Sequence, residues 1–583
     1  MDRKIFTVAT VSFLFLLSFF SGIILSAQIL GILKLYYPIP VLLLTLTVSG
    51  TLFYICLKTV SNHFLKVFPD QDNGKTLSRT SIVGYLAGGI LLTIVLVLPL
   101  TLWPLSGIRQ NLAWDAGLYH LPKAAELVVS HSLLDLSIAY GEYPSGYEML
   151  IAFSFILKRA GYLIGTAHAL ILIFFLLGLF LLLGRFSKGP KGILFFITVF
   201  TVASYDIFRS IESNPFQMLR VSAFDIGMND FFLAAAIIAL ILFSPVGPNP
   251  ENAKSYSLLG MGLSTSLILG TKPNGIFIAA GLWTIALIYE ILFYRKNRIT
   301  FKQISKRWLL PVLLSLLGSL WAFRNLVMIG SLFNPSTLAI NQYSIMSNLS
   351  NPFFYRYLDL NFKIVLFFFF LSILFSIFWK KIHWSFTVTF SFLLLGFCAT
   401  PTSAFFGSVD KPAEIAWRFG LYLLAFLLPV IFYFFDKPIN AILGLWRSGF
   451  ALLIGAVMIV ITLYGSFLNF SRLEPNLERL IVLEDQFQES VGVGGYYSPY
   501  DYIRKNVHHS VVWVENGMPF YVFGKDLTNS ITRSRNPDYY VFFQTPWNDT
   551  RSYPPELSTE NFLKSWQLVY QDSEGRVYKR TDL

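Results

Sequence analysis

Long apolar runs alternate with short polar stretches along most of the chain. Many of these runs have the length, about 17–25 residues, that a helix needs to cross a bilayer. The pattern predicts thirteen spans, at 5–33, 39–57, 81–103, 162–184, 192–208, 230–244, 257–271, 275–294, 308–329, 363–379, 384–400, 418–435 and 448–469. The first is far longer than the apolar core of a cleaved signal peptide, so we expect it to be a retained helix. The apolar stretch 147–157 suits a re-entrant segment or a helix along the interface.

Composition agrees with this pattern. Of the 583 residues, 55% are hydrophobic and only 13% are charged, whereas soluble domains carry roughly 25% charged residues. We therefore expect an α-helical polytopic membrane protein, which excludes a soluble enzyme, a disordered chain and a disulfide scaffold. Cys56 and Cys398 both lie inside apolar runs and are interpreted as packing residues.

The net charge of +12 could indicate nucleic-acid binding, but its distribution indicates membrane topology instead. Almost half of the 45 Lys and Arg residues fall in one alternating set of termini and short loops, for example Arg295-Lys296-Asn297-Arg298. Basic residues in short loops mark the cytoplasmic side. We therefore predict a multi-pass protein of the plasma (inner) membrane with a cytoplasmic N-terminus. An odd number of spans places the C-terminal tail outside.

The polar regions on the outer side define the expected organisation. The loop 104–161 is too long for a simple connection, and its apolar positions in 112–134 suit helices lying on the membrane surface. We divide the chain into an N-terminal hairpin and cytoplasmic loop (1–80), a membrane domain (81–470) and an extracytoplasmic domain (471–583).

The tail changes to an α/β pattern. Ser498-Pro499 are typical of a helix start, as cap and first residue. Strands are predicted at Val511–Val514 and Tyr539–Phe543. A hairpin is predicted from Trp566–Gln571 and Arg576–Arg580 around the turn Asp572–Gly575.

One group of candidate functional residues lies in the first outer loop, within Trp114-Asp115-Ala116-Gly117-Leu118-Tyr119-His120. On a helix, Asp115 and Tyr119 share a face and His120 lies beside them. A carboxylate at the bilayer surface next to aromatic side chains could act as the general base for an acceptor hydroxyl. The alternative is that Asp115 is solvated and caps an interfacial helix.

Three basic residues lie at predicted outer membrane edges: Lys272, Arg324 beside Asn325, and Arg418, which follows Glu414. Charges at such positions are costly and are usually kept for ligands or partners. Three cations that converge on one cavity would suit a phosphate head group. The alternative for each is snorkelling to lipid head groups.

A second acidic pair, Asp225 and Asp230, precedes a predicted span. These carboxylates could cap that helix, bind a divalent cation or contact a sugar. The histidines show no zinc-type spacing, and we predict no metal site and no certain cofactor. The chain has no phosphate-cradling glycine loop that would indicate ATP hydrolysis.

The order of these motifs resembles the GT-C superfamily of integral membrane glycosyltransferases, near its protein mannosyltransferase-like and aminoarabinose transferase-like members. The resemblance covers about residues 81–583 and departs from many members at Asp115-Ala116, where they have an acidic pair. The features that carry it are Asp115, Tyr119 and His120, then Tyr143–Tyr147, the turn Gly270–Gly275 with Lys272, Arg324-Asn325, Thr400-Pro401 with Arg418, and the α/β tail.

This resemblance implies transfer of a hexosyl or pentosyl unit from a polyprenyl-phosphate sugar to a glycan, lipid or protein acceptor outside the cytoplasm, with inversion. Asp115 would be the general base, and Lys272, Arg324 and Arg418 would bind the donor phosphate. Trp114, Tyr119, His120, Tyr143, Asn325, Glu414, Asp225 and Asp230 would contact substrate. The donor would be a co-substrate, membrane lipids would surround the chain, and nucleic acid would not be a partner.

Three other functions fit the sequence less well. A transporter of lipids or glycans predicts broken helices or polar residues near the bilayer midplane, whereas the polar residues here gather at one edge. A non-catalytic membrane scaffold would disperse the same residues over lipid-facing surfaces. A ligase that uses a pyrophosphate-linked donor is a further possibility, intermediate between the transferase and the other two functions.

Overall fold

The structure is a computed structural model of the whole chain. It describes residues 2–59, 116–134, 141–157, 163–186, 229–248, 256–273, 275–297, 301–332, 360–378, 382–399, 419–435, 498–514, 519–524, 527–532, 536–543, 564–572 and 575–582. The predicted spans 81–103, 192–208 and 448–469 lie outside the described residues.

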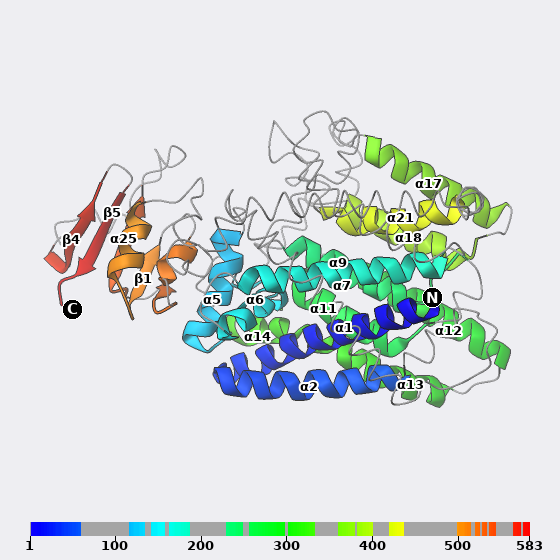
Figure 1. Cartoon of the computed structure of the whole chain (residues 1–583), viewed down its shortest axis with the longest axis horizontal. Helices are drawn as coiled ribbons and strands as arrows, with labels where there is room; N and C mark the ends of the chain where they lie inside the picture. Colours follow the sequence, from blue (N-terminus) through cyan, green and yellow to red (C-terminus); the bar gives the residue numbers. More distant parts are fainter. Residues whose placement is uncertain are drawn as a thin grey trace.

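A bundle of apolar helices forms most of the described molecule (Figure 1). The other predicted spans all fall on helices. Three of the described helices are long and apolar enough to cross a membrane alone, or up to four when a bent pair counts as one span. The helices are α1 (Asp2–Ile32), α2 (Pro38–Thr59), α6 (Gly146–Leu157), α7 (Leu163–Phe186), α9 (Asn229–Phe243), α11 (Leu258–Thr271), α12 (Gly275–Asn297), α13 (Phe301–Leu317), α14 (Leu320–Ile329), α17 (Leu360–Ile377), α18 (Trp384–Cys398) and α21 (Leu421–Phe434).

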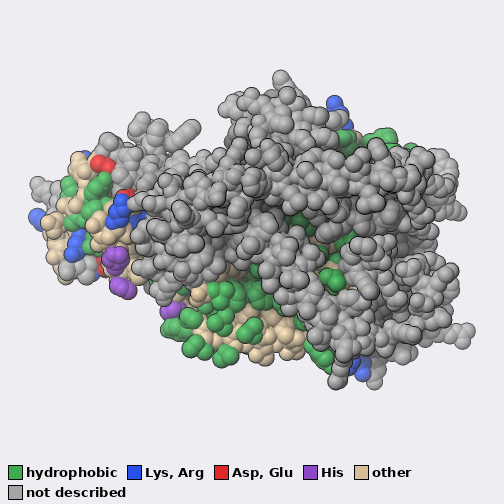
Figure 2. Space-filling model, viewed as in Figure 1, with side chains coloured by type: hydrophobic (Ala, Val, Ile, Leu, Met, Phe, Trp, Pro, Cys, Tyr) green, Lys and Arg blue, Asp and Glu red, His purple; other side chains and the backbone are tan. Residues whose placement is uncertain are grey.

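Helix α9 is the centre of the bundle. Every one of its residues is buried, and it packs against α7, α11 and α21. A helix that is apolar all round is expected in such a position. By contrast, α2 exposes large apolar side chains such as Ile39, Leu43 and Leu46, and Figure 2 shows apolar side chains gathered over the α1–α2 hairpin. This face is the one suited to contact lipid.

The predicted span 308–329 is broken. Helices α13 and α14 meet at 55°, and the break falls at Gly318-Ser319. A Cβ atom on Gly318 would lie 1.9 Å from the carbonyl oxygen of Ser266 in α11. Only glycine allows the two backbones to approach so closely. The hydropathy pattern showed the apolar length of this segment but not the bend.

The apolar stretch 147–157 forms a buried helix. It is α6, which packs against α1, α7 and α11 as well as the short helix α5 (Leu121–Ser130). Helix α5 continues from a π-helical turn, η1 (Ala116–His120). In place of a helix lying on the membrane surface, residues 121–128 are buried throughout.

The tail contains α25 (Ser498–Asn506), β1 (Val511–Val514), the 3-10 turn η5 (Pro519–Phe523), β2 (Ser530–Thr532), β3 (Tyr539–Phe543), β4 (Trp566–Gln571) and β5 (Gly575–Arg580). The strands form one sheet in the order β2-β1-β3-β5-β4. Strand β1 pairs in parallel with β2 and β3, while β5 is antiparallel to β3 and β4. The helix at Ser498, the strands β1 and β3 and the β4–β5 hairpin are thereby confirmed; β2 was not predicted.

The tail packs on the end of the bundle that carries α5, away from the N-terminus (Figure 1). Turn η5 and strand β2 contact η1 and α5. The Phe155 and Phe520 rings stack at a centroid distance of 6.1 Å, and the Glu126 carboxylate accepts a hydrogen bond from the Ile531 amide (3.4 Å). The tail therefore covers part of α5.

Candidate functional site

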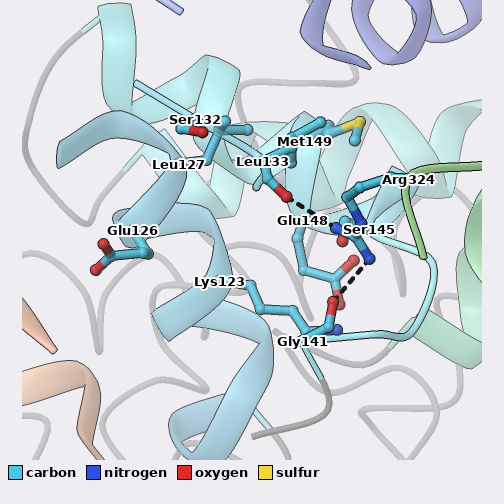
Figure 3. Close-up of a pocket in the computed structure, with 10 residues that line it drawn as sticks. All are labelled: Lys123, Glu126, Leu127, Ser132, Leu133, Gly141, Ser145, Glu148, Met149 and Arg324. Carbon is cyan, nitrogen blue, oxygen red and sulfur yellow. Dashed lines mark hydrogen bonds between the residues drawn. The ribbon is translucent and has the colours of Figure 1, made fainter. Parts of the chain in front are cut away.

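A cavity lies between α5, the turn 141–145, α6 and α14, at the end of the bundle next to the tail. The space between these elements is about 370 Å³ when the open solvent at its mouth is counted, and the enclosed part is only about 20 Å³. Figure 3 shows Lys123, Glu148 and Arg324 directed towards one another across it, whereas Glu126 points away from them. The cavity is lined by Lys123, Glu126, Leu127, Ser132, Leu133, Gly141, Ser145, Glu148, Met149 and Arg324.

Local sequence positions these elements. Pro122 occupies the first turn of α5, where its missing N–H costs nothing. The helix ends at His131, which adopts a left-handed conformation (φ 56°). The Nδ1–H group of its ring donates a hydrogen bond to the Tyr36 carbonyl oxygen at 3.0 Å. Helix α6 begins at Gly146, where a Cβ atom would lie 2.6 Å from the Gly270 carbonyl oxygen. The start of α6 and the end of α11 are therefore in direct contact.

Lys123 is the buried cation of α5. Its side chain is 8% exposed, and its ammonium lies 5.7 Å and 5.8 Å from the ring centroids of Tyr119 and Tyr143. The ammonium makes no hydrogen bond within the described part of the chain. Burial lowers the pKa of Lys123 to about 8; Arg324 acts in the same direction, and Glu148 and Glu142 oppose it.

Arg324 is held by main-chain carbonyl groups. It donates to the carbonyl oxygens of Leu133 (3.1 Å) and Gly141 (2.9 Å), and to the side chain of Asn325. Asn325 in turn donates to the Glu142 carbonyl oxygen at 2.7 Å. A guanidinium has five N–H donors in one plane. Arg324 of α14 can therefore hold the chain at Leu133 and at Gly141 at the same time.

Glu148 and His120 form a buried pair. Nδ1 of His120 lies 2.7 Å from Oε1 of Glu148, and both side chains are almost completely inaccessible. The second carboxylate oxygen, Oε2, has no hydrogen-bond partner among the described residues. Among the described residues, Oε2 of Glu148 and the ammonium of Lys123 therefore both lie in the site without a hydrogen-bond partner.

Lys272 lies at the end of α11 and contacts Asp230 at the start of α9 in an ion pair. Its ammonium also lies 4.9 Å from the centroid of the Phe419 ring. The Gly146–Gly270 contact joins this pair to the cavity, and Trp321 of α14 donates to the Leu269 carbonyl oxygen (2.9 Å). Lys272 therefore lies next to the cavity wall, with Asp230 as its partner.

The structure brings together Tyr119, His120, Tyr143, Arg324 and Asn325 from the predicted set, with Lys272 and Asp230 paired nearby. The remaining candidates, Trp114, Asp115, Asp225, Glu414 and Arg418, lie outside the described residues. Asp115 directly precedes the buried residue Ala116 at the start of η1.

Two residues of the cavity were not singled out from the sequence, Lys123 and Glu148. Glu148 is the only charged side chain in the stretch 146–157, and Lys123 shares the largely apolar stretch 121–129 with Glu126. Such charges usually face a cavity or a partner, and this signal could have identified both. No group of three or more His, Cys, Asp or Glu side chains that could hold a metal ion occurs in the described parts of the chain.

Comparison with known proteins gives one structural similarity. No protein-family model and no curated protein matches the chain. The crystal structure of ArnT from Cupriavidus metallidurans bound to undecaprenyl phosphate is similar over 84% of this chain and 98% of its own, with 13% sequence identity and a TM-score of 0.44.

Proposed function

We propose that this chain is a membrane glycosyltransferase that moves a hexosyl or pentosyl unit from a polyprenyl-phosphate donor to an acceptor outside the cytoplasm. The observation that carries the proposal is the cavity at the tail end of the bundle. It combines buried cations, a buried carboxylate and two tyrosine rings. Buried charges of this kind in a membrane protein are costly and are usually kept for function.

The proposed reaction is a single inverting displacement. An acceptor hydroxyl oxygen attacks the anomeric carbon of the donor, the bond from that carbon to the phosphate oxygen breaks, and Asp115 takes the hydroxyl proton. Polyprenyl phosphate leaves with the bonding electron pair. Fixed positive charge around the cavity stabilises this leaving group, as it does in other transfer reactions; the sequence offers Arg324, Lys272 and Arg418 for this role. The donor lipid diffuses in the membrane, so the reaction needs no nucleotide site.

The test is release of polyprenyl phosphate by the reconstituted full-length protein. It is supplied with a panel of hexosyl and pentosyl polyprenyl phosphates and a membrane extract as the acceptor source, and products are measured by mass spectrometry. We expect release with at least one donor and a loss of about 10²–10⁴-fold in Asp115→Asn, the usual contribution of a general base. Release by Asp115→Asn at the parental rate would show that Asp115 is not the base.

A carrier of lipid-linked sugars is the second candidate, because the α13–α14 break resembles the discontinuous helices of transporters. A carrier moves the lipid between leaflets with its sugar still attached. The same assay separates the two functions: a transferase produces free polyprenyl phosphate, and a carrier does not.

A further inference from the structure

We infer that the cavity binds the donor head group through two residues, with Lys123 holding the phosphate and Oε2 of Glu148 accepting a hydrogen bond from a sugar hydroxyl. This assignment rests on the proposed function for the identity of the ligand. It differs from the three cations expected from the sequence.

The described cations near the cavity differ in whether their N–H groups already have acceptors. Lys272 is paired with Asp230, and Arg324 donates to two carbonyl oxygens and Asn325. Lys123 is more than nine-tenths buried and makes no hydrogen bond among the described residues. A buried ammonium without a partner is costly, and an anionic ligand would remove that cost. Lys123 is therefore the cation best suited to receive a phosphate.

The second step concerns the carboxylate. Glu148 uses Oε1 for His120, which fixes the carboxylate in place, and leaves Oε2 without a partner. An ionised carboxylate only accepts hydrogen bonds, so its complement is a donor such as a sugar hydroxyl. The rings of Tyr119 and Tyr143 flank Lys123 and provide flat apolar faces against which a sugar ring can pack. The cavity thus offers partners for both parts of a phosphorylated sugar.

The third step concerns access from the lipid. Helix α14 turns Arg324 and Asn325 inward but exposes Phe323 (53%) and Val327 (83%) on its opposite side. A single helix therefore separates the cavity from an exposed apolar surface, which is suited to contact lipid. This arrangement favours a phosphate carried on a lipid over free phosphate in solution.

Binding to the full-length protein tests the inference independently of turnover. Four probes are compared by the rise they cause in the apparent Tm: polyprenyl phosphate, a polyprenyl-phosphate sugar, polyprenol and inorganic phosphate. We expect the two phosphate-bearing lipids to bind and the other two probes not to bind. Lys123→Met should bind polyprenyl phosphate about 10- to 100-fold more weakly, the range for loss of a hydrogen bond to a charged group. Lys123→Arg should restore binding to within a few-fold.

Matched controls separate loss of the ligand contact from loss of the fold. Lys58→Met removes an exposed lysine at the end of α2 and should leave all binding unchanged. Unliganded Lys123→Met should be at least as stable as the parent, because the substitution removes an unpaired buried charge. Glu148→Gln should bind the polyprenyl-phosphate sugar about tenfold more weakly than the parent does. It should bind polyprenyl phosphate at least as tightly as the parent.

Three results would overturn the inference: parental binding of polyprenyl phosphate by Lys123→Met, equal binding of inorganic phosphate and the lipid, or binding of neither. Each is distinguishable from failure of the proposed function. Lys123-dependent lipid binding without any sugar transfer would support this site and contradict the transferase. Sugar transfer that does not depend on Lys123 would support the transferase and contradict this site.

Discussion

Buried cations at the two ends of the bundle are stabilised in different ways. Arg185 donates to the carbonyl oxygens of Leu242 and Ser244 at the end of α9, a position where helix carbonyl groups lack partners. Arg324 likewise binds carbonyl oxygens, and Lys272 binds a carboxylate. Among the described residues, Lys123 makes no hydrogen bond; two tyrosine rings flank its ammonium, and Glu148 and Glu142 interact with it only through their charge. This contrast distinguishes a cation that stabilises the fold from one that is available to a ligand.

The first prediction concerns pH and follows from Lys123. Its pKa of about 8 lies below the ordinary lysine value of 10.5, so between these values the unfolded chain binds more protons than the folded one. Stability from this group therefore rises with pH across that window. The charged and titratable groups around it are Arg324, Glu148, Glu142, Glu126, Tyr119, Tyr143 and, through Glu148, His120.

The measurement is the apparent Tm of the unliganded parent and of Lys123→Met from pH 7 to pH 10. Other groups titrate in both proteins, so the difference between them isolates Lys123. We expect the advantage of Lys123→Met over the parent to shrink as the pH rises. A difference that stays constant would contradict the lowered pKa.

The second prediction concerns Arg324→Lys. A lysine keeps the charge but cannot place a planar fork of donors on the carbonyl oxygens of Leu133 and Gly141. Leaving a buried carbonyl unsatisfied costs about 1–3 kcal/mol, so we expect a clearly lower apparent Tm. Arg307→Lys is the control, because Arg307 is half exposed and its ion pair with Glu290 is one that a lysine can also make. Equally small decreases in the apparent Tm of both variants would show that the hydrogen bonds from Arg324 to the two carbonyl oxygens do not stabilise the fold.

At the scale of elements, the helices were predictable because a membrane span needs only apolar length. The helix at Ser498 and the β4–β5 hairpin were predictable from cap and turn residues. The break at Gly318 was not, since its cause is the Ser266 carbonyl oxygen of another helix. The burial of α5 was not predictable either, because residues about 400 positions later in the chain cover part of this helix.

The third prediction tests the break. Gly318→Ala would place a methyl group where the Ser266 carbonyl oxygen lies, and main chain cannot move as easily as a side-chain end. We expect a substantially lower apparent Tm or loss of folded protein in size-exclusion chromatography. Gly50→Ala in α2 meets no atom within 4 Å and should be neutral or stabilising, as alanine favours a helix by up to about 1 kcal/mol. Similar stability of the two variants would show that the close approach is absent.

At the scale of the whole molecule, the tail domain and the cavity share helix α5. Glu126 lines the cavity entrance and also binds the Ile531 amide of β2, while Phe155 of α6 stacks on Phe520 of η5. The tail is therefore placed to support the wall that carries Lys123. Sequence showed the two regions separately, but their contact depends on the packed structure.

The fourth prediction follows from this contact. Phe520→Ala removes the stacked ring and should weaken docking of the tail on α5, because stacked aromatic pairs contribute about 0.5–1.5 kcal/mol beyond their buried area. Hydrogen exchange of the α5 amides should become faster. Leu568→Ala, an exposed position in β4, is the control and should not change α5. Unchanged exchange in Phe520→Ala would show that the tail does not stabilise α5.

The site itself was partly predictable. Arg324 was selected as a charge at a predicted membrane edge, and Tyr119 and His120 by their helical spacing from Asp115. Tyr143 and Asn325 were expected at the site from the resemblance to GT-C enzymes. Which of the cations has free donors was not predictable, since Arg324 is satisfied by carbonyl oxygens from residues 133 and 141. Hydrogen bonds of this kind depend on backbone positions that no pattern of residue types reveals.

The most direct measurement is a cryo-electron microscopy map of the full-length protein with a non-hydrolysable polyprenyl-phosphate sugar. The account predicts phosphate density in the cavity between α5, α6 and α14, within hydrogen-bonding distance of Nζ of Lys123, and the sugar between Glu148 and the tyrosine rings with its anomeric carbon facing Asp115. A head group bound elsewhere on the bundle, with this cavity filled only by water, would contradict it.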